Sequence, residues 1–538
     1  MYENMIVIDR QARESLQMQI RRQLAICIVN RQFPLHEPLP SIRRLASDLK
    51  VSVTTVVQVY SALKKDGFVM SRRRSGFFVN PDALADPGHA AVARERADET
   101  QPARVDFATL FQGRSFNRER VVKPADLVVR YRYPFACGLI DPSLFPLARW
   151  RECVRDAADV VGVGNCATDF SETDDEMLIE QLVQRVLARR GIFARPGEVL
   201  VTVGSQQAIY IAMRLLLAPG ETIGVEDPGY PDAVAMARME GINVQRLPVD
   251  DGGLVLSERL GRCKCLYVTP SHQFPTTVTM PPARRSELLE LTRQHNQFVI
   301  EDDYESDISF NKTPPRALSN LDRRGNVIYV GSLSKSLLQG LRLGYLVADR
   351  EFVREARALR HYMVRHPPVN NQRSAALFLQ RGYYDRFIAR LTGIYGRRCD
   401  AMHESLERHF PGAAAKPEYG GGNIWLKLPE EVDARILQEL VEPDGVYFET
   451  GAHAFSDERG NRNHARLGYS VIDEALIAEG IERIARAVPK ARGAGAALGK
   501  AETRGEPGRP SGELTSRNRW SAARPAVLDD ASLQSAAC

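Results

Sequence analysis

Apolar positions follow two different periods along the chain, and the change between them divides the sequence. Within residues 1–80 they recur every three or four residues, which predicts helices, and two short apolar runs at 68–70 and 77–79 predict a strand pair. Within residues 134–490, helical patterns alternate with short runs rich in Val, Ile and Leu, namely EVLVTVG, TIGVEDPG, KCLYVTP, FVIEDDY, VIYVGS and RLGYLVA. This alternation predicts an α/β fold whose mostly parallel sheet carries helices on both faces.

Two stretches have neither period. Residues 81–133 are polar and rich in Ala, Arg and Asp, and a stretch of this length without a core element predicts a linker. Residues 491–538 are rich in Ala, Gly and Pro and predict a disordered tail. We therefore expect a first domain over 1–80, a linker over 81–133, a large domain over 134–490 and a tail over 491–538.

Composition adds one asymmetry to this plan. The 538 residues are 44% hydrophobic and 26% charged, as in ordinary multidomain globular proteins. Residues 1–80 hold 13 Lys and Arg against 6 Asp and Glu, whereas the rest of the chain holds 59 against 61. This split predicts a small basic module that binds a polyanion. No run approaches the roughly 18 apolar residues of a membrane helix, and no CxxC pair occurs, so we expect a cytoplasmic protein without a membrane or metal site.

The basic module carries the pattern of a helix-turn-helix followed by a hairpin. Ser41 and Ser52 stand where their side chains can cap two successive helices, and the second helix would run to Lys65. That helix would expose polar side chains near its start, where recognition helices meet base edges and phosphates. The residues predicted to bind DNA are Arg43, Ser52, Thr54, Thr55, Gln58, Arg72, Arg73 and Arg74. A helical hairpin with a solvated run of arginines is the plainer interpretation of the same pattern.

In the large domain, a lysine comes after a predicted strand with hydroxyl and guanidinium groups nearby. Lys335 ends the sequence Gly331-Ser332-Leu333-Ser334-Lys335, and Arg342 lies seven residues later. The amine can condense with an aldehyde while Ser332, Ser334 and Arg342 hold a phosphate. A surface loop is the alternative for this segment taken alone.

Three further segments come directly after predicted strands. In Glu301-Asp302-Asp303-Tyr304, a carboxylate could pair with a protonated pyridine nitrogen and the tyrosine could bond a phenolate oxygen. Ser205 and Gln206 open a predicted helix, whose first backbone N–H groups suit a phosphate. Tyr230 places a ring at the sheet edge, where it could stack on a planar cofactor. Each segment taken alone is more typical of structure than of function.

Taken together, residues 133–488 resemble the fold-type I aminotransferases that bind pyridoxal 5'-phosphate. The match extends to the segments Phe135-x-x-Gly138, Pro270-Ser271-His272-Gln273-Phe274-Pro275-Thr276 and Arg466-Leu467-Gly468-Tyr469. The resemblance implies that Lys335 is the Schiff-base lysine and that Arg466 holds the carboxylate of an amino-acid ligand. It implies cofactor contacts from Ser205, Gln206, Tyr230, Asp302, Tyr304, Ser332 and Arg342. Asp303 is the alternative to Asp302.

Residues 39–79 resemble the winged helix-turn-helix of GntR-type regulators through Leu39-Pro40-Ser41, Val51-Ser52, Thr55-Val56-Val57 and Gly76-Phe77-Phe78-Val79. A winged helix followed by an aminotransferase-like domain resembles the MocR/GabR subfamily of transcriptional regulators. That resemblance implies a homodimer on double-stranded promoter DNA. The large domain departs from transaminases at Phe274 and Thr277, where those enzymes favour the Asn and Gly of an NPTG turn, and at Gln339, where proline is usual.

These observations leave three functions open. The first is a transcriptional regulator that senses an amino acid or amine as an external aldimine with the cofactor on Lys335. The second is a catalytically active aminotransferase with an accessory DNA-binding domain. The third is a repressor whose large domain serves only as a dimerisation scaffold. The departures at Phe274, Thr277 and Gln339 leave cofactor capture intact and weaken the case for efficient turnover, so we favour the first.

Overall fold

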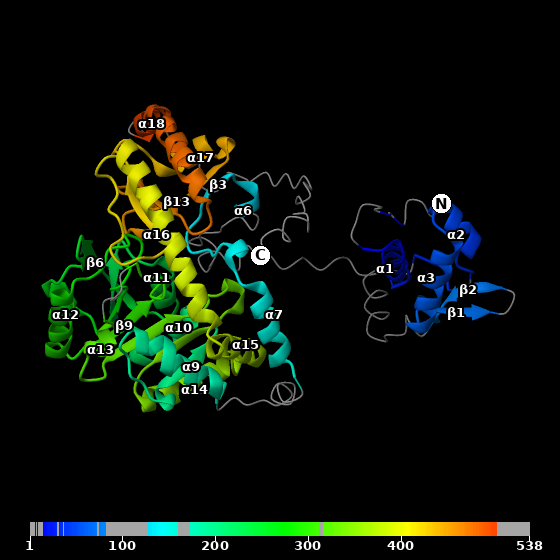
Figure 1. Cartoon of the computed structure of the whole chain (residues 1–538), viewed down its shortest axis with the longest axis horizontal. Coiled ribbons are helices and arrows are strands. Elements are labelled where there is room, and N and C mark those ends of the chain that lie inside the picture. The colour runs from blue at the N-terminus through cyan, green and yellow to red at the C-terminus, as the bar shows by residue number, and fades with distance from the viewer. Residues whose placement is uncertain are drawn as a thin grey trace, which may run out of the picture. The chain divides into compact units, whose positions relative to one another are not determined.

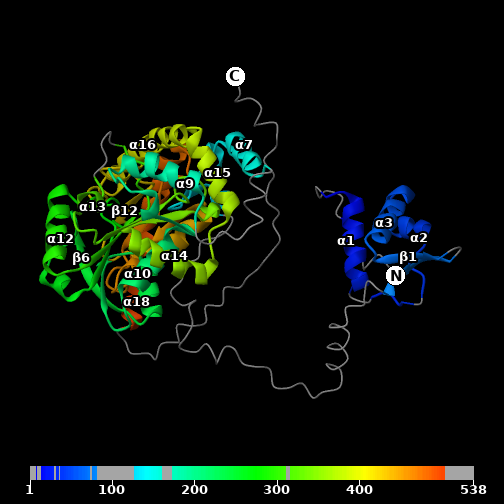
Figure 2. The same cartoon turned by 90° about the horizontal axis from the view of Figure 1, so that it is seen from below.

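The chain divides into two compact units, Met1–Arg118 and Glu119–Cys538, and each is described by itself. The computed structural model describes residues 6, 8, 14–29, 32–35, 37–72, 75–81, 127–159, 173–310 and 316–502. Most of the predicted linker, 82–126, and the end of the predicted tail, 503–538, lie outside the described residues. Figure 1 and Figure 2 label the elements of both units.

The first unit is a winged helix-turn-helix. Its elements are α1 (Leu16–Val29), α2 (Ile42–Asp48), α3 (Val53–Lys65), β1 (Val69–Arg72) and β2 (Gly76–Val79). The two strands pair antiparallel, with Val69 opposite Val79, as the two apolar runs predict. Both predicted caps form, because the Ser41 side chain accepts from the Arg44 N–H at 3.3 Å and that of Ser52 from the Thr55 N–H at 3.0 Å.

The wing is tied to the recognition helix through Tyr60. Its ring lies parallel to that of Phe77, with 4.7 Å between the centroids, and its hydroxyl donates to the Pro40 carbonyl at 2.7 Å. Tyr60 is fully buried with Val56, Val59 and Leu63 along the inner face of α3. The inner face of the recognition helix therefore packs into one core that includes the wing strands.

The second unit is built on an eight-stranded sheet in the order β4-β11-β10-β9-β8-β5-β6-β7. Strands β10, β9, β8, β5 and β6 are parallel, β11 and β7 run against them, and β4, which pairs antiparallel with β11, runs in the same direction as the five. The sheet is therefore mostly parallel, and each predicted apolar run is one of its strands. The bounds are β4 (Val199–Thr202), β5 (Thr222–Asp227), β6 (Asn243–Asp250), β7 (Gly253–Leu254), β8 (Cys265–Val268), β9 (Phe298–Asp303), β10 (Val327–Ser332) and β11 (Gly344–Val347).

Helices cover both faces of this sheet because successive residues of a strand point to opposite sides. On one face Ile300 packs with α10 (Gly204–Leu216), α11 (Pro231–Met239) and α14 (Arg350–Val364). On the other face Val299 packs with α12 (Pro282–Gln294) and α13 (Leu318–Leu321). Helices α10 and α12 can be followed on the two sides of the sheet in Figure 2. Further along that second face lie α7 (Leu147–Ala157), α9 (Glu176–Gln181), the π-helical segment η3 (Leu182–Leu187), α15 (Val369–Gln380) and α16 (Tyr383–His409).

A smaller sheet in the order β12-β14-β13-β3 completes the unit. Helices α17 and α18 pack against it and lie together at one end of the unit in Figure 1. Its elements are β3 (Tyr133–Phe135), β12 (Asn423–Lys427), α17 (Ala434–Val441), β13 (Val446–Thr450), β14 (His464–Gly468) and α18 (Glu474–Glu502). Short helical turns are η2 (Pro142–Leu144), η4 (Pro196–Glu198), η5 (Glu258–Arg262), η6 (Gln339–Leu341), η7 (Glu442–Asp444) and η8 (Ala452–Ala454).

Two expected boundaries are wrong. Helix α6 (Leu127–Arg130) lies inside the predicted linker, where Leu127 is buried against Tyr131 and Val471 of the large unit. Helix α18 continues to Glu502, past the predicted start of the tail at 491, although this stretch includes three glycines, which have low helix propensity. Within the residues that the structure describes, no helix is long and apolar enough to cross a membrane.

Candidate functional site

The predicted site residues gather where parallel strands end. Lys335 comes after β10, Asp302 lies at the end of β9, Tyr230 comes after β5 and Ser205 after β4. The carboxyl ends of parallel strands face the same edge of a sheet, which is where open α/β sheets bind their ligands. Lys335 is half-buried there, and Gly138 lies directly against its amine. A Cβ built on Gly138, whose φ is +67°, would meet the lysine Nζ at 2.8 Å.

The three consecutive carboxylates of β9 have different partners. Glu301 accepts from the backbone N–H groups of Leu318 and Ser319 at 2.7 and 2.9 Å, so it caps α13. Asp303 is buried in an ion pair with Arg190, whose Nε lies 2.8 Å from its Oδ2. Asp302 points to the opposite face of the strand, where it accepts from the Tyr267 hydroxyl at 2.7 Å. Its other oxygen, Oδ1, is buried and has no partner among the described residues.

Electrostatics separate the two aspartates as well. Burial raises the pKa of Asp302 to about 7, although the Tyr267 hydroxyl and the Lys335 charge each pull it down. Burial also acts on Asp303, but the Arg190 charge and the Tyr329 hydroxyl outweigh it and hold that pKa below its ordinary value. Asp302 is therefore the carboxylate whose charge lacks a full partner, whereas Asp303 is neutralised within the fold. This difference favours Asp302 over Asp303 for a cationic group of a ligand.

An anion cradle forms where α10 begins. The Arg342 guanidinium lies against Gly204, because a Cβ at that glycine would meet Nη2 at 2.8 Å. Ser205 and Gln206 occupy the first turn of α10, where backbone N–H groups have no partners within the helix. The Gln206 side chain turns away and donates to Asp232 at 3.2 Å, so it offers its backbone. Ser332 is buried at the end of β10 beside this cradle.

One expected phosphate contact is not supported by the geometry. The Ser334 hydroxyl donates to the Leu343 carbonyl at 3.0 Å and accepts from the Leu343 N–H at 2.8 Å. Its donor and one acceptor position are therefore used to close the turn between β10 and β11. Ser334 shapes this loop and is not placed as a phosphate ligand.

Aromatic rings line the space between the cradle and Arg466. The Tyr230 ring lies 6.5 Å from that of Tyr267 and 5.4 Å from that of Phe274, centroid to centroid, and its hydroxyl donates to Asp232 at 2.9 Å. The Tyr304 ring lies 6.4 Å from Phe274. The Tyr304 hydroxyl is buried without a partner among the described residues, so it is available to a ligand.

Arg466 is buried and enclosed on several sides. Its Nη1 lies 3.5 Å from Glu449 Oε2, its Nη2 donates to Asn423 Oδ1 at 3.2 Å, and its guanidinium carbon lies 4.4 Å from the centre of the Phe274 ring. The Nε atom has no partner among the described residues. A guanidinium that keeps one buried donor free suits an acidic ligand group.

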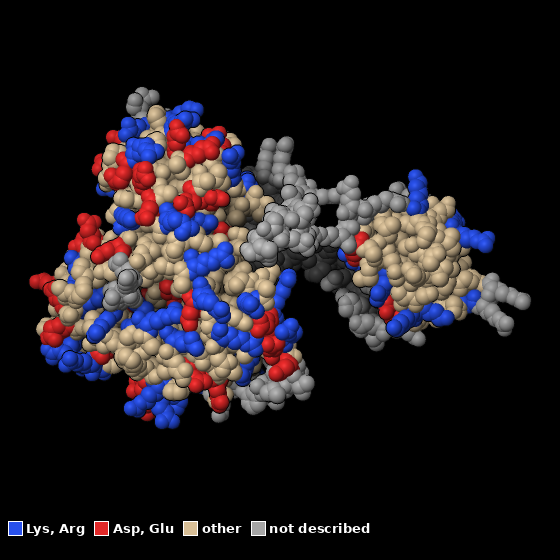
Figure 3. Space-filling model, in the orientation of Figure 1, with Lys and Arg blue, Asp and Glu red and all other residues tan. Residues whose placement is uncertain are grey.

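The predicted DNA contacts lie on the first unit as expected where the structure describes them. Arg43, Thr54, Gln58 and Arg72 are exposed, and Thr55 is half-buried. The Ser52 side chain is occupied as the cap of α3, and the Arg72 guanidinium lies 4.4 Å from the centre of the Phe78 ring. Arg73 and Arg74 lie outside the described residues. Lys and Arg side chains are spread around the rim of this unit in the view of Figure 3.

Some site residues carried no usable signal in the sequence. Tyr267, Arg190 and Asn423 come from β8, the segment after η3, and β12, and each meets its partner across a long stretch of chain. A tyrosine inside the apolar run KCLYVTP is typical of a core position, and an asparagine at the start of a strand is typical of a turn. Only the three-dimensional fold identifies them.

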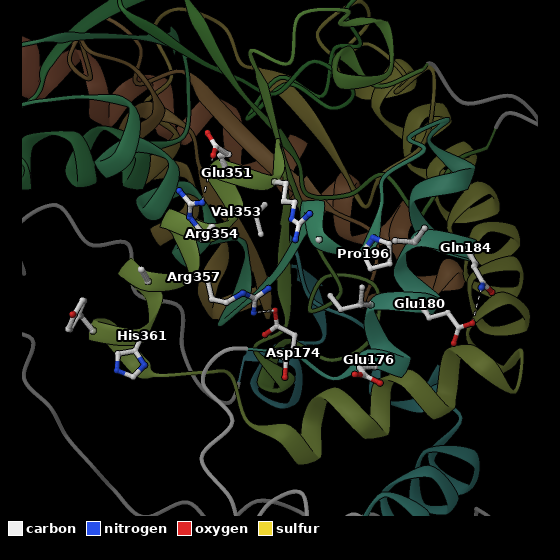
Figure 4. Close-up of a pocket in the computed structure, with 17 residues that line it drawn as sticks. Asp174, Glu176, Glu180, Gln184, Pro196, Glu351, Val353, Arg354, Arg357 and His361 are labelled. Carbon is white, nitrogen blue, oxygen red and sulfur yellow. Dashed lines mark hydrogen bonds and ion pairs between the residues drawn. The ribbon is translucent and has the colours of Figure 1, made fainter.

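A separate cavity of about 1470 Å³ opens at the β4 edge of the sheet, between α9 and α14. Figure 4 shows Arg357 and Asp174 turned toward each other there, 2.7 Å apart, and Arg354 lies 3.7 Å from Glu351. No residue of the predicted site lines this cavity. Several of the charged side chains that line it form ion pairs with one another. Among the described residues, no group of three or more His, Cys, Asp or Glu side chains could hold a metal ion.

Family models match both units. Residues 16–79 match the gntR family of bacterial regulatory proteins, and residues 144–484 match aminotransferase class I and II. The HTH-type transcriptional regulator TauR of Rhodobacter capsulatus is 39% identical over 477 residues, which is 88% of this chain and 96% of that protein. The probable rhizopine catabolism regulatory protein MocR of Rhizobium meliloti is 27% identical over 89% of this chain and 95% of that protein.

Solved structures match the large unit. The α-aminoadipate aminotransferase LysN of Thermus thermophilus, complexed with N-(5'-phosphopyridoxyl)-L-leucine, is similar with a TM-score of 0.63 and 29% identity, over 73% of this chain and 100% of that chain. The kynurenine aminotransferase of Pyrococcus horikoshii is similar with a TM-score of 0.62 and 28% identity, over 76% of this chain and 98% of that chain. Both support the aminotransferase fold of the large unit.

Proposed function

We propose that this chain, which belongs to the aminotransferase class I and II family and joins that domain to a gntR-family DNA-binding domain, senses a primary amine or amino acid at Lys335. It is a pyridoxal-phosphate-dependent transcriptional regulator, as its two domains and its likeness to TauR and MocR over nearly the whole chain indicate. What it senses, and through which residues, is the proposed part.

The residues present fit pyridoxal 5'-phosphate. The buried Asp302 Oδ1 and the Tyr304 hydroxyl both lack partners among the described residues, and they suit the pyridinium N–H and the phenolate oxygen of the cofactor. The cradle of Gly204, Ser205 and Arg342 suits its phosphate, and Gly138 leaves the Lys335 amine accessible where a side chain would cover it. These four features are the observation that supports Lys335 as the attachment point.

Each residue of the site has a separate role in binding the cofactor and the effector. Lys335 supplies the amine that the cofactor's aldehyde can exchange for the amine of an effector, which is the chemistry the cofactor brings when bound. Asp302 keeps a negative charge beside the ring nitrogen. Arg466 holds the acidic end of an amino-acid effector through its Nε, which has no partner among the described residues. The Phe274 ring lies against both the Tyr230 ring and the Arg466 guanidinium, so it supplies an apolar wall beside these groups.

Effector binding changes transcription only if the effector binds two arrangements of the regulator with different affinities. A difference of about 1–3 kcal/mol would change DNA affinity by roughly 5- to 150-fold. In the DNA-binding unit, exposed Thr54 and Gln58 support contacts to base edges, and Arg43 and Arg72 support contacts to phosphates. We also propose a homodimer, so that two winged helices meet two half-sites, and a cytoplasmic location, because that is where bacterial DNA lies.

The test uses the protein as purified, together with Lys335→Ala. Borohydride reduction should fix the cofactor to the peptide that carries Lys335 in the wild type only. Adding an effector amine should change both the visible absorbance and the affinity for promoter DNA in the wild type. Lys335→Ala should still bind DNA and should lose the response to effector. An unchanged response in that variant would support a large domain that serves only as a scaffold.

A second candidate function is an active aminotransferase, and the intact set of Lys335, Asp302, Tyr304 and Arg466 favours it. Steady conversion of an amino acid with an acceptor keto acid, at ordinary enzyme rates, would establish that function. A single half-reaction without turnover would support the regulator.

A further inference from the structure

Asn423 is the neutral polar side chain that is hydrogen-bonded to the Arg466 guanidinium. It begins β12, next to β14, which carries Arg466, and it is fully buried. Its Oδ1 accepts from Arg466 Nη2 at 3.2 Å, which points the carbonyl end of the amide at the guanidinium. Its Nδ2 is buried and has no partner among the described residues.

The pair therefore presents two donors that the described residues leave unsatisfied, Arg466 Nε and Asn423 Nδ2. Proteins rarely leave buried N–H groups without an acceptor, because each such group forfeits its hydrogen bonds to water. Two donors on two residues that are hydrogen-bonded to each other can share one acceptor group. A carboxylate has two oxygens and accepts only, so its chemistry complements this pair.

No hydrogen bond from a described side chain satisfies either donor, although the Glu305 carboxylate acts on the Arg466 charge and keeps a buried Oε2 without a partner among the described residues. The Glu449 carboxylate beside Arg466 is already engaged: Oε2 lies 3.5 Å from Arg466 Nη1 and Oε1 accepts from the Cys137 N–H at 3.1 Å. The Phe274 ring covers the guanidinium at 4.4 Å and offers no lone pair. The open acceptor position is thus left to a ligand.

We propose that Asn423 is a specificity-determining residue that donates a second hydrogen bond to the carboxylate of the effector, beside Arg466. This rests on the proposed function and extends it. Arg466 alone supplies charge, whereas Arg466 with Asn423 supplies two donors in a fixed arrangement. The site thereby favours amino acids over simple amines that have the same side chain but no acid group.

The experiment compares ligand pairs that differ only in the carboxylate. The holoprotein is titrated with L-alanine and ethylamine, L-leucine and 3-methylbutylamine, and L-phenylalanine and 2-phenylethylamine, and binding is followed by the visible absorbance. The amine-to-amino-acid ratio of dissociation constants measures what the carboxylate contributes. Wild-type protein, Asn423→Ala and Asn423→Asp are compared. Asn463→Ala is the matched control, because it removes another buried amide, which donates to the Leu428 carbonyl at 2.7 Å, from the segment that leads into β14.

In Asn423→Ala the ratio should fall by about 10- to 100-fold, as expected for the loss of a hydrogen bond to a charged group. Affinity for the plain amines and the cofactor content should stay within about threefold of wild type. Asn423→Asp keeps the acceptor for Arg466 and places a negative charge beside the ligand, so it should lower the ratio further. Asn463→Ala should leave the ratio unchanged.

Three outcomes overturn the inference. If amines and amino acids weaken equally in Asn423→Ala, the residue only supports the fold. If neither weakens while the wild type responds, the amide does not touch the carboxylate, and the proposed function survives without this residue. If the wild type responds to none of the six compounds, sensing of amines at Lys335 fails and this inference fails with it.

Discussion

The contrast between Asp302 and Asp303 predicts that replacing each with asparagine changes the stability of the apoprotein in opposite directions. Asp302 is buried with a pKa raised from 3.8 to about 7, so the folded apoprotein holds its proton more tightly than the unfolded chain does. Stability from this group is present below the unfolded pKa and is lost as pH rises toward 7. Asp302→Asn removes the buried charge and keeps an oxygen that accepts from Tyr267.

The size of the effect can be worked from the shift. About three pKa units correspond to roughly 4 kcal/mol of lost stability once the Asp302 carboxyl is ionised in both the folded and the unfolded protein. About 1–2 kcal/mol of this is already lost at pH 5, so the advantage of Asp302→Asn over the wild type should grow by about 2–3 kcal/mol between pH 5 and pH 8 and level off above pH 8. The group is 5% exposed, so solvent screens little of this effect.

Asp303→Asn is the matched control and should change stability in the opposite direction. The Asp303 pKa is held below its ordinary value by Arg190, so its contribution is present above the unfolded pKa and is lost only as pH falls through the folded pKa. Removing the carboxylate leaves the Arg190 guanidinium buried without its counter-charge, which costs about 3–5 kcal/mol at neutral pH.

The assay is urea unfolding of the apoprotein at pH 5, 6, 7 and 8, followed by intrinsic fluorescence, and then of the same variants with added cofactor. Asp302→Asn should be the more stable apoprotein at pH 8 and should gain less from the cofactor, because the partner of the ring nitrogen is gone. If Asp302→Asn destabilises the apoprotein at pH 8 as Asp303→Asn does, then Asp302 is a structural carboxylate and the assignment of the ring-nitrogen partner is wrong.

The remaining predictions concern single side chains. Gly138→Ala should reduce the cofactor content, measured by absorbance, because its Cβ would meet the Lys335 amine at 2.8 Å, and should also lower stability by about 1–2 kcal/mol because alanine is strained at φ +67°. Ser52→Ala removes the cap of α3 and should cost about 1 kcal/mol in unfolding of the DNA-binding unit, measured by denaturant titration. Arg72→Ala should weaken binding to all DNA sequences alike and lower the salt dependence by about one charge in fluorescence titrations. Gln58→Ala should leave the salt dependence unchanged and relax discrimination at one base pair by about 1–3 kcal/mol.

Most of the fold could be predicted because the spacing of apolar residues along the chain indicates which sides of each helix or strand are buried. Runs such as VIYVGS and FVIEDDY are apolar on both sides of the strand, and the structure places both near the centre of the large sheet. The boundary at the start of the large unit depends on contacts from elsewhere in the chain: α6 is four residues long and is anchored by Leu127 against Val471. No local pattern predicts such an anchor.

The site was predictable as far as it is made of residues that come directly after strands. Lys335 and Asp302 lie at or just after the ends of parallel strands, and Arg342 lies just before antiparallel β11, whose start is at the same edge of the sheet. The choice between Asp302 and Asp303 was not settled by the sequence, since a period of two says that they face opposite sides and not which side holds the ligand. The contacts of Tyr267 and Arg190 favour Asp302, and each of these residues meets its aspartate across 35 or more residues of chain.

The turn at Phe274 and Thr277 differs in sequence from the NPTG turn of transaminases, yet it keeps a turn conformation while presenting different side-chain chemistry. Thr277 adopts φ +64°, a left-handed conformation that a β-branched residue rarely takes, and its N–H donates to the Gln273 carbonyl at 2.7 Å. The turn that a glycine would favour therefore forms without one. Phe274 at the same turn has a ring against Arg466 in place of an amide that donates hydrogen bonds. The turn therefore keeps its backbone shape and lacks that amide donor beside Arg466, which weakens the case for efficient turnover.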